Sequence, residues 1–207
     1  MRTIIYVDGF NLYYGCLKGT PYRWLDLERL CDLLLPKNQI IAIKYFTALI
    51  KPRPGEADQP VRQQTYLRAL KTSPRVLIYY GHFLSHKVIL PMANPVAGIP
   101  RMVKVLKTDE KGSDVNLATH LINDAHKNEF DCGVVMSNDS DLAEPIRIIT
   151  TELKKPIGFI NPQARTSKKL LSLASFMRKI RVCKLAAAQF PDKIRDDIGE
   201  ITKPTTW

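Results

Sequence analysis

The pattern of apolar and polar positions along the chain predicts strands and helices that follow one another. Short apolar runs without polar alternation lie at Arg2–Asp8 and Cys132–Met136. Such runs are typical of strands that helices cover on both faces of a parallel sheet. Apolar residues with helical spacing lie at Asp26–Leu35 and between Leu142 and Leu153. The sequence therefore predicts an α/β fold with a mostly parallel central sheet and helices on both faces.

Other segments complete this pattern. Further strands are expected at Gln39–Ile50, Arg75–Leu84, Arg101–Thr108, Pro156–Ile160 and Lys179–Val182, and further helices at Val61–Thr72, Ser113–Asn128 and Thr166–Met177. Two proline-rich stretches, Lys51–Pro60 and Pro91–Pro100, are predicted to be irregular. The second stretch would connect two of these strands, so we expect residues around 85–108 to form a hairpin-like insertion beside the sheet. We expect residues 1–185 to form one domain and residues 186–207 a loosely ordered tail.

Composition narrows the class of protein. The chain has 207 residues, of which 45% are hydrophobic, enough for a full core. Four cysteines are widely spaced and form no CxxC pair, so we interpret them as buried thiols in a reducing compartment. No run is long enough to span a membrane, and the N-terminus does not resemble a signal peptide. These features predict a cytoplasmic protein.

Charge is unevenly distributed along the chain. The net charge is +11, and residues 44–107 contain eleven basic side chains and two acids. Residues 108–145 contain nine acids and two bases, whereas residues 161–184 contain seven bases and no acid. This arrangement predicts an acidic pocket rimmed by a surface that binds a polyanion. Solvated basic faces are common, so charge alone leaves nucleic-acid binding open.

Four aspartates lie where the predicted strands end or helices begin. Asp8 and Asp139 follow strands, Asp141 comes two residues later, and Asp114 opens a helix. Open α/β sheets bind ligands beyond the carboxyl ends of their strands, and carboxylates are suitable ligands for Mg²⁺ or Mn²⁺. Asn11, one helical turn after Asp8, is an amide that can orient such a ligand. Each acid also has a simpler interpretation as a helix cap or turn residue, with Ser113 or Asp114 capping its helix.

Three motifs resemble those of a known family. Val7–Leu12, Lys111–Ala118 and Ser137–Leu142 look like the motifs of the NYN branch of PIN-like domains, also called LabA-like or DUF88 proteins. The resemblance implies a PIN-like fold, a metal site at Asp8, Asp114, Asp139 and Asp141 with Asn11 beside it, and ribonuclease activity in many relatives. One departure is His120, where many relatives have an acid; Asp124, one turn beyond, is an alternative ligand. Pyridine hydroxylation also occurs within the family.

The sequence leaves three functions open. The first is a metal-dependent ribonuclease that uses metal-activated water and binds single-stranded or structured RNA. Its expected phosphate-binding residues are Arg53, Arg62, Arg68, Lys168, Lys169, Arg178 and Arg181. The second is a non-catalytic RNA-binding or regulatory module. The third is an oxidoreductase that hydroxylates an N-heterocycle, although no flavin, haem or His-containing iron motif supports it. Dinucleotide, P-loop and HExxH motifs are absent from the sequence.

Overall fold

The computed structural model of the chain describes residues 1–52, 55, 57–95, 98, 100–205 and 207. Arg53, which we expected to bind RNA, lies outside these residues. So do parts of the two proline-rich stretches, at 53–54, 56, 96–97 and 99.

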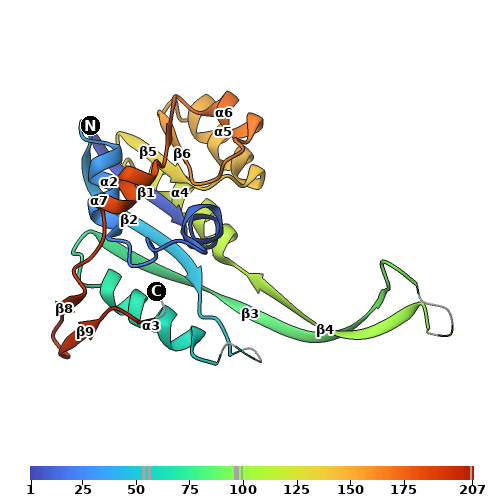
Figure 1. Cartoon of the computed structure of the whole chain (residues 1–207). Helices are drawn as coiled ribbons and strands as arrows, with labels where there is room; N and C mark the ends of the chain where they lie inside the picture. The colour runs from blue at the N-terminus through green and yellow to red at the C-terminus, as the bar shows by residue number, and fades with distance from the viewer. Residues whose placement is uncertain (53–54, 56, 96–97, 99, 206) are drawn as a thin grey trace.

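A seven-stranded sheet forms the centre of the molecule (Figure 1). Its order is β4-β3-β2-β1-β5-β6-β7, and only the β3–β4 pair is antiparallel. The strands are β1 (Arg2–Asp8), β2 (Gln39–Ala48), β3 (Val76–Pro91), β4 (Met102–Lys111), β5 (Cys132–Met136), β6 (Ile157–Asn161) and β7 (Phe176–Lys179). The predicted mostly parallel α/β fold is confirmed.

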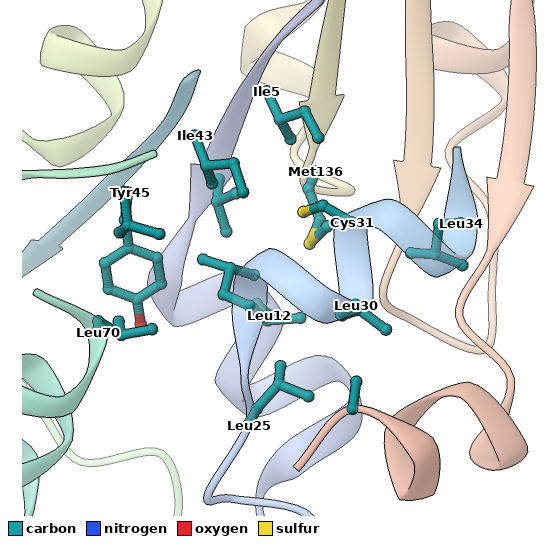
Figure 2. Close-up of a cluster of buried hydrophobic side chains, with 14 of the residues drawn as sticks. Ile5, Leu12, Leu25, Leu30, Cys31, Leu34, Ile43, Tyr45, Leu70 and Met136 are labelled. Atoms are coloured by element: carbon teal, nitrogen blue, oxygen red, sulfur yellow. The ribbon is translucent and has the colours of Figure 1, made fainter. Parts of the chain in front are cut away.

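Helices cover both faces of this sheet because β1 is apolar on both of its faces. Ile5 and Val7 belong to one buried cluster, shown in Figure 2, and Ile4 and Tyr6 belong to the other. The first cluster includes side chains from α2 (Leu27–Leu34), α3 (Gln59–Leu70) and α7 (Val182–Ala187). The second includes side chains from α4 (Ser113–His126), α5 (Ala143–Thr151) and α6 (Lys168–Leu173). None of the helices in the described ranges is long and apolar enough to cross a membrane.

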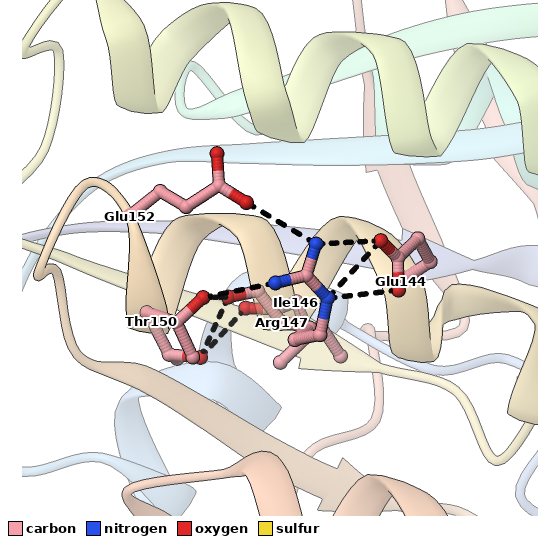
Figure 3. A network of polar contacts seen from close by, with 6 residues as sticks. Glu144, Ile146, Arg147, Thr150 and Glu152 are labelled. Atoms are coloured by element: carbon pink, nitrogen blue, oxygen red, sulfur yellow. Dashed lines mark hydrogen bonds and ion pairs between the residues drawn. The ribbon is translucent and has the colours of Figure 1, made fainter.

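The outer surface of α5 carries a small polar network (Figure 3). Arg147 donates to Glu144 at 2.7 Å and to Glu152 at 3.1 Å. All three side chains are largely exposed, so solvent screening limits each pair to about 0.2–1 kcal/mol. The buried apolar face of α5, with Ile146 and Ile149, anchors the helix much more strongly.

The predicted hairpin-like insertion is present, but its strands are longer than expected. Only Val76–Gly81 of β3 pairs with β2. Beyond Gly81, β3 pairs with β4 from His82–Lys111 to Pro91–Met102 and projects away from the body (Figure 1). The first strand therefore continues well past its predicted end at Leu84.

The predicted strand at Lys179–Val182 is wrong by a few residues. The last strand of the sheet is Phe176–Lys179, and the helix before it ends at Leu173. Phe176 pairs with Gly158 on β6, and a Cβ on Gly158 would lie 2.2 Å from the Phe176 ring. This close approach sets where β7 joins the sheet, and apolar periodicity along the chain does not report it.

The segment after Gln189 is not loosely ordered, contrary to expectation. It forms a two-stranded sheet of β8 (Lys193–Arg195) and β9 (Glu200–Thr202). Trp207 packs against Trp24 and Tyr66, with ring centroids 6.0 and 5.4 Å apart. The polar composition of this segment predicts little order, whereas the ring contacts of Trp207 hold its end against the body of the protein.

Candidate functional site

Asp8 lies at the carboxyl end of β1, buried and firmly held. One carboxylate oxygen accepts the backbone N–H of Asn11 at 2.9 Å, which makes Asp8 the N-cap of α1 (Gly9–Leu12). The other accepts the Ser137 hydroxyl at 3.0 Å. Burial raises the pKa of Asp8, and these two hydrogen bonds act in the opposite direction. The helix-cap interpretation is thus correct, but it does not exclude a role at the site, because each oxygen retains acceptor capacity.

Gly9 allows Asp8 to approach the neighbouring strand. A Cβ at this position would lie 2.6 Å from the Tyr45 ring and 2.8 Å from the Phe46 carbonyl oxygen. The backbone carrying Asp8 therefore lies directly against β2. Only glycine fits this contact without a shift of the strand.

Asp139 follows β5 and is linked to Asp8 through Ser137. The Asp139 N–H donates to the Ser137 hydroxyl oxygen at 3.1 Å, and that hydroxyl donates to Asp8. Asp139 also caps the single turn Ser140–Leu142 by accepting the Asp141 N–H at 3.0 Å. Asp141 itself is exposed. The motif after β5 thus carries one partly buried acid, Asp139, and one exposed acid, Asp141.

Asp114 lies in the first turn of α4, directly after the hairpin. The predicted cap by Ser113 or Asp114 is wrong, since the N-cap is Gly112 in a left-handed conformation with φ 95°. Glu110 accepts the Ser113 hydroxyl at 2.7 Å and the Ser113 N–H at 3.2 Å instead. Desolvation and repulsion from Asp8, Asp139, Glu110 and Asp141 raise the pKa of Asp114 to about 6.

One cavity of about 710 Å³ brings the acids together. Asp8, Asp114 and Asp139 all line it, together with Glu110, whereas Asp141 does not. Much of the remaining wall is aromatic and comes from Phe10, Tyr13, Tyr14, Tyr45, Tyr66, Phe83 and Trp207. The cavity therefore combines a cluster of negative charge with flat apolar surfaces.

Asn11 holds the surrounding loops. Its side-chain oxygen accepts the Asn138 N–H at 3.0 Å and the Gln163 amide at 3.1 Å. Asn138 in turn donates to Gln163 and Arg165 and accepts the Ser167 N–H at 2.8 Å. Asn11 thus positions the loop that carries Asp139, and its oxygen already has two donors.

Asp124, the alternative ligand, is part of the core. It accepts the Tyr6 hydroxyl at 2.5 Å and the Lys44 ammonium at 2.6 Å. His120 packs against Tyr79, with ring centroids 4.1 Å apart. Neither Asp124 nor His120 lines the cavity.

The expected phosphate-binding residues are dispersed. Arg62 lines the acidic cavity and pairs with Asp58, whereas Arg68 forms two hydrogen bonds of 2.5 and 2.6 Å with Asp196 and holds the β8–β9 segment. Lys168 and Lys169 are exposed in the first turn of α6, beside the Asn138 contact. Arg178 and Arg181 lie at a second hollow by β7.

The acidic residues suit a divalent cation by donor type and charge. Three carboxylates from separate segments line one space, and burial together with like charges raises the pKa of Asp114. Mg²⁺ and Mn²⁺ prefer such oxygen ligands. In the part of the chain that the structure describes, no three His, Cys, Asp or Glu side chains are yet close enough to enclose an ion.

Replacing Asp114 with Asn is expected to stabilise the metal-free protein at neutral pH. The pKa of about 6 in the folded protein exceeds the usual 3.8, so the wild type loses stability as the pH rises from about 4 to about 6. Asn lacks this penalty. We expect its unfolding free energy to exceed that of the wild type by about 1 kcal/mol above pH 6, after discounting for solvent screening.

Urea unfolding in EDTA at pH 4 and pH 7.5 measures this difference, with Asp109→Asn as the control because a neighbouring Lys107 lowers the pKa of Asp109. If the wild type and Asp114→Asn were equally stable at both pH values, the neighbouring acids would not destabilise the ionised Asp114 carboxylate as proposed.

Sequence reasoning missed several residues of the site. Ser137 and Asn138 lie inside a motif, and their polar character at a buried strand end was a usable signal. Glu110 was visible as part of the acidic stretch. The aromatic wall comes from α1, the π-helical turn Tyr13–Leu17 after it, β2, α3, β3 and the C-terminus, and nothing local to those segments indicates that they meet.

Comparisons with known proteins agree with this fold. The chain is 33% identical over 237 residues to 6-hydroxy-3-succinoylpyridine 3-monooxygenase HspA of Pseudomonas putida (strain DSM 28022 / S16), with 100% of this chain and 75% of that protein covered. A crystal structure of a protein of unknown function, VPA0982 from Vibrio parahaemolyticus RIMD 2210633, covers 87% of this chain and 93% of its own, with a TM-score of 0.56 and 17% identity. That likeness shows the fold alone. The family model described as NYN domain matches residues 2–180, so the chain belongs to the NYN domain family and has its nuclease-type fold.

Proposed function

We propose that this protein is a metal-dependent ribonuclease. The observation that supports it most is that Asp8, Asp114 and Asp139, which lie far apart in the sequence, line the same cavity. Their oxygens would hold Mg²⁺ or Mn²⁺. When bound, such an ion supplies Lewis-acid activation of water and neutralises the phosphodiester.

The chain's own groups divide the remaining work. Asn11 and Ser137 fix the two oxygens of Asp8, which removes the cost of orienting that carboxylate during the reaction. Aromatic rings such as Tyr13, Tyr14 and Phe83 offer stacking surfaces for unpaired bases. Lys168 and Lys169 are exposed in the first turn of α6, next to the Asn138 contact, and would bind phosphates of the RNA outside the cavity.

Cleavage of an end-labelled single-stranded RNA tests this proposal. We expect cleavage in Mn²⁺ or Mg²⁺ that falls to background in EDTA and returns when the metal is restored, because the carboxylates alone cannot neutralise a phosphodiester. Double-stranded DNA of the same length serves as the control substrate. If the protein bound RNA in a salt-sensitive way but did not cleave it in either metal, the ribonuclease proposal would be wrong and the protein would be a non-catalytic RNA-binding module.

A second candidate is oxidation of a small N-heterocycle. The relative of 33% identity is named as a monooxygenase of a substituted pyridine, and the match covers this whole chain. The cavity volume of about 710 Å³ lies within the range of roughly 300–1,000 Å³ typical of small-molecule sites, and its walls are aromatic. NADH consumption that depends on both oxygen and a hydroxypyridine, in the absence of RNA cleavage, would favour this candidate over the nuclease.

A further inference from the structure

The cavity that holds the acids passes over the carboxyl ends of the strands, from one face of the sheet to the other. Asp114 lies on α4, which covers one face, whereas Arg62 lies on α3, which covers the opposite face, and both side chains line the cavity. By strand alternation Asp8 continues the face of β1 that carries Ile4 and Tyr6, which is the α4 side. The cavity therefore has an acidic end on the α4 side and a second end on the α3 side.

Basic side chains gather at the α3 end. Those that line the cavity are Arg62 on α3, Arg23 in the segment before α2 and Lys51 in the segment after β2. The Tyr66 hydroxyl, one turn after Arg62, donates to the Leu25 carbonyl oxygen at 3.0 Å and so holds the segment with Arg23 against α3. The Arg23 Nε donates to the Thr20 carbonyl oxygen at 3.2 Å, which restrains the guanidinium.

The chain before Lys51 is tied to the same helix. Gln63 accepts the Ile50 N–H at 2.9 Å and donates to a carbonyl oxygen at the end of β2, also at 2.9 Å. Arg62 pairs with Asp58, whose side chain is 61% exposed and does not line the cavity. Solvent screening weakens a pair with so exposed an acid, so an anionic group of a ligand can compete for the guanidinium.

The distribution of charge fixes how an anionic ligand can lie in this cavity. Four carboxylates at or near the α4 end repel a further negative charge, and three cations at the α3 end attract it. Between them the wall is aromatic, and Trp207, which packs against Tyr66, is part of it. Aromatic side chains offer flat faces on which planar rings stack.

We propose that the α3 end of the cavity is a binding subsite for an anionic group attached to a planar ring, and that Arg23 and Arg62 bind the anion. The phosphate of a nucleotide and the carboxylate of a small heteroaromatic acid share this chemistry. In the proposed ribonuclease the ligand is a nucleotide next to the cleaved bond, and that identification rests on the proposed function. The subsite itself does not depend on which reaction the acids support.

Calorimetric titration of the full chain in EDTA tests the proposal with two pairs of probes. Uridine 5′-monophosphate and pyridine-3-carboxylate carry the anion, whereas uridine and pyridine-3-carboxamide are their neutral counterparts. We expect at least one anionic probe to bind about tenfold more tightly than its counterpart, because the guanidinium groups form charge-assisted hydrogen bonds with the anion alone. Whichever anionic probe binds identifies the ligand as a nucleotide or as a small heteroaromatic acid.

Variants locate the binding. Arg23→Gln and Arg62→Gln should each weaken binding of the anionic probe by about tenfold or more. The matched control is Arg29→Gln, which removes the same charge from an exposed position on α2 that does not line the cavity, and its affinity should stay within about twofold of the wild type. Circular dichroism checks the fold of each variant, and the two cavity variants give independent measurements.

Three results would overturn the subsite. They are no binding of either anionic probe at millimolar concentration, equal binding of the neutral counterparts, and equal affinities in Arg23→Gln, Arg62→Gln and Arg29→Gln. RNA cleavage, measured separately, keeps this inference distinct from the proposed function. A wild type that cleaves RNA but binds neither probe loses the subsite alone, whereas probe binding that depends on Arg23 without any RNA cleavage removes the ribonuclease and keeps the subsite.

Discussion

Asp139→Asn is expected to lower the rate of Mn²⁺-dependent RNA cleavage by about 10²- to 10³-fold while leaving RNA affinity nearly unchanged. Asn has the same size as Asp and retains an oxygen that can accept the Asp141 N–H, so the turn after β5 persists. What is lost is the negative charge facing the cavity. Single-turnover cleavage and a separate binding measurement in Ca²⁺ distinguish the loss of chemistry from the loss of binding.

The matched control is Asp141→Asn, the same chemical change two residues away. Asp141 is exposed and does not line the cavity, so we expect a loss of less than about tenfold, within the range for one indirect electrostatic contact. Asp139→Asn that cleaves RNA as fast as the wild type would remove this carboxylate from the proposed mechanism. An equal loss in both variants would show that Asp141 turns toward the metal when it binds.

Asp124→Ala is expected to destabilise the folded protein by about 3–5 kcal/mol. Asp124 is 4% exposed, and it accepts hydrogen bonds from both the Lys44 ammonium and the Tyr6 hydroxyl. Its removal leaves a buried positive charge and a buried donor without this acceptor. Urea unfolding at pH 7 measures the loss, since the midpoint shifts while the slope against urea should not.

The double variant Lys44→Met with Asp124→Leu distinguishes the cost of leaving Lys44 as an unpaired buried charge from the cost of lost packing. Replacing a buried ion pair with apolar side chains of similar size is often close to neutral, so we expect it to recover most of the lost stability. RNA cleavage by Asp124→Ala, measured well below its unfolding midpoint, should match the wild type. A stable Asp124→Ala protein that fails to cleave RNA would instead place Asp124 at the site.

Part of the acidic site could be predicted from short stretches of sequence. Asp8 and Asp139 were placed at strand ends because apolar runs without polar alternation end just before them, and both lie there in the structure. The same reasoning could not separate Asp139 from Asp141. Asp139 follows Met136, the last residue of β5, by three residues and Asp141 follows it by five, and only the turn geometry determines which of them faces the cavity.

Other parts of the site depend on contacts between distant segments. Asn11 lies beside Asp8, where the sequence predicts it, but only the structure shows that its side-chain oxygen also holds the loops after β5 and β6 through Asn138 and Gln163. Arg68 was expected to bind RNA, but it pairs with Asp196, 128 residues away. In each case the sequence shows the polar group, and only the fold shows its partner.

By itself the sequence determined the order of the strands and helices from β1 to β6, the two-sided burial of β1 and β5, and the acids at strand ends, because apolar spacing and strand termination are properties of a few neighbouring residues. The tertiary structure alone decided the aromatic wall of the cavity, the core position of Asp124, the start of β7 at Phe176 and the outward course of the β3–β4 hairpin. These depend on which side chains meet across the sheet, and that is set by packing between segments far apart in the chain rather than by any pattern within one of them.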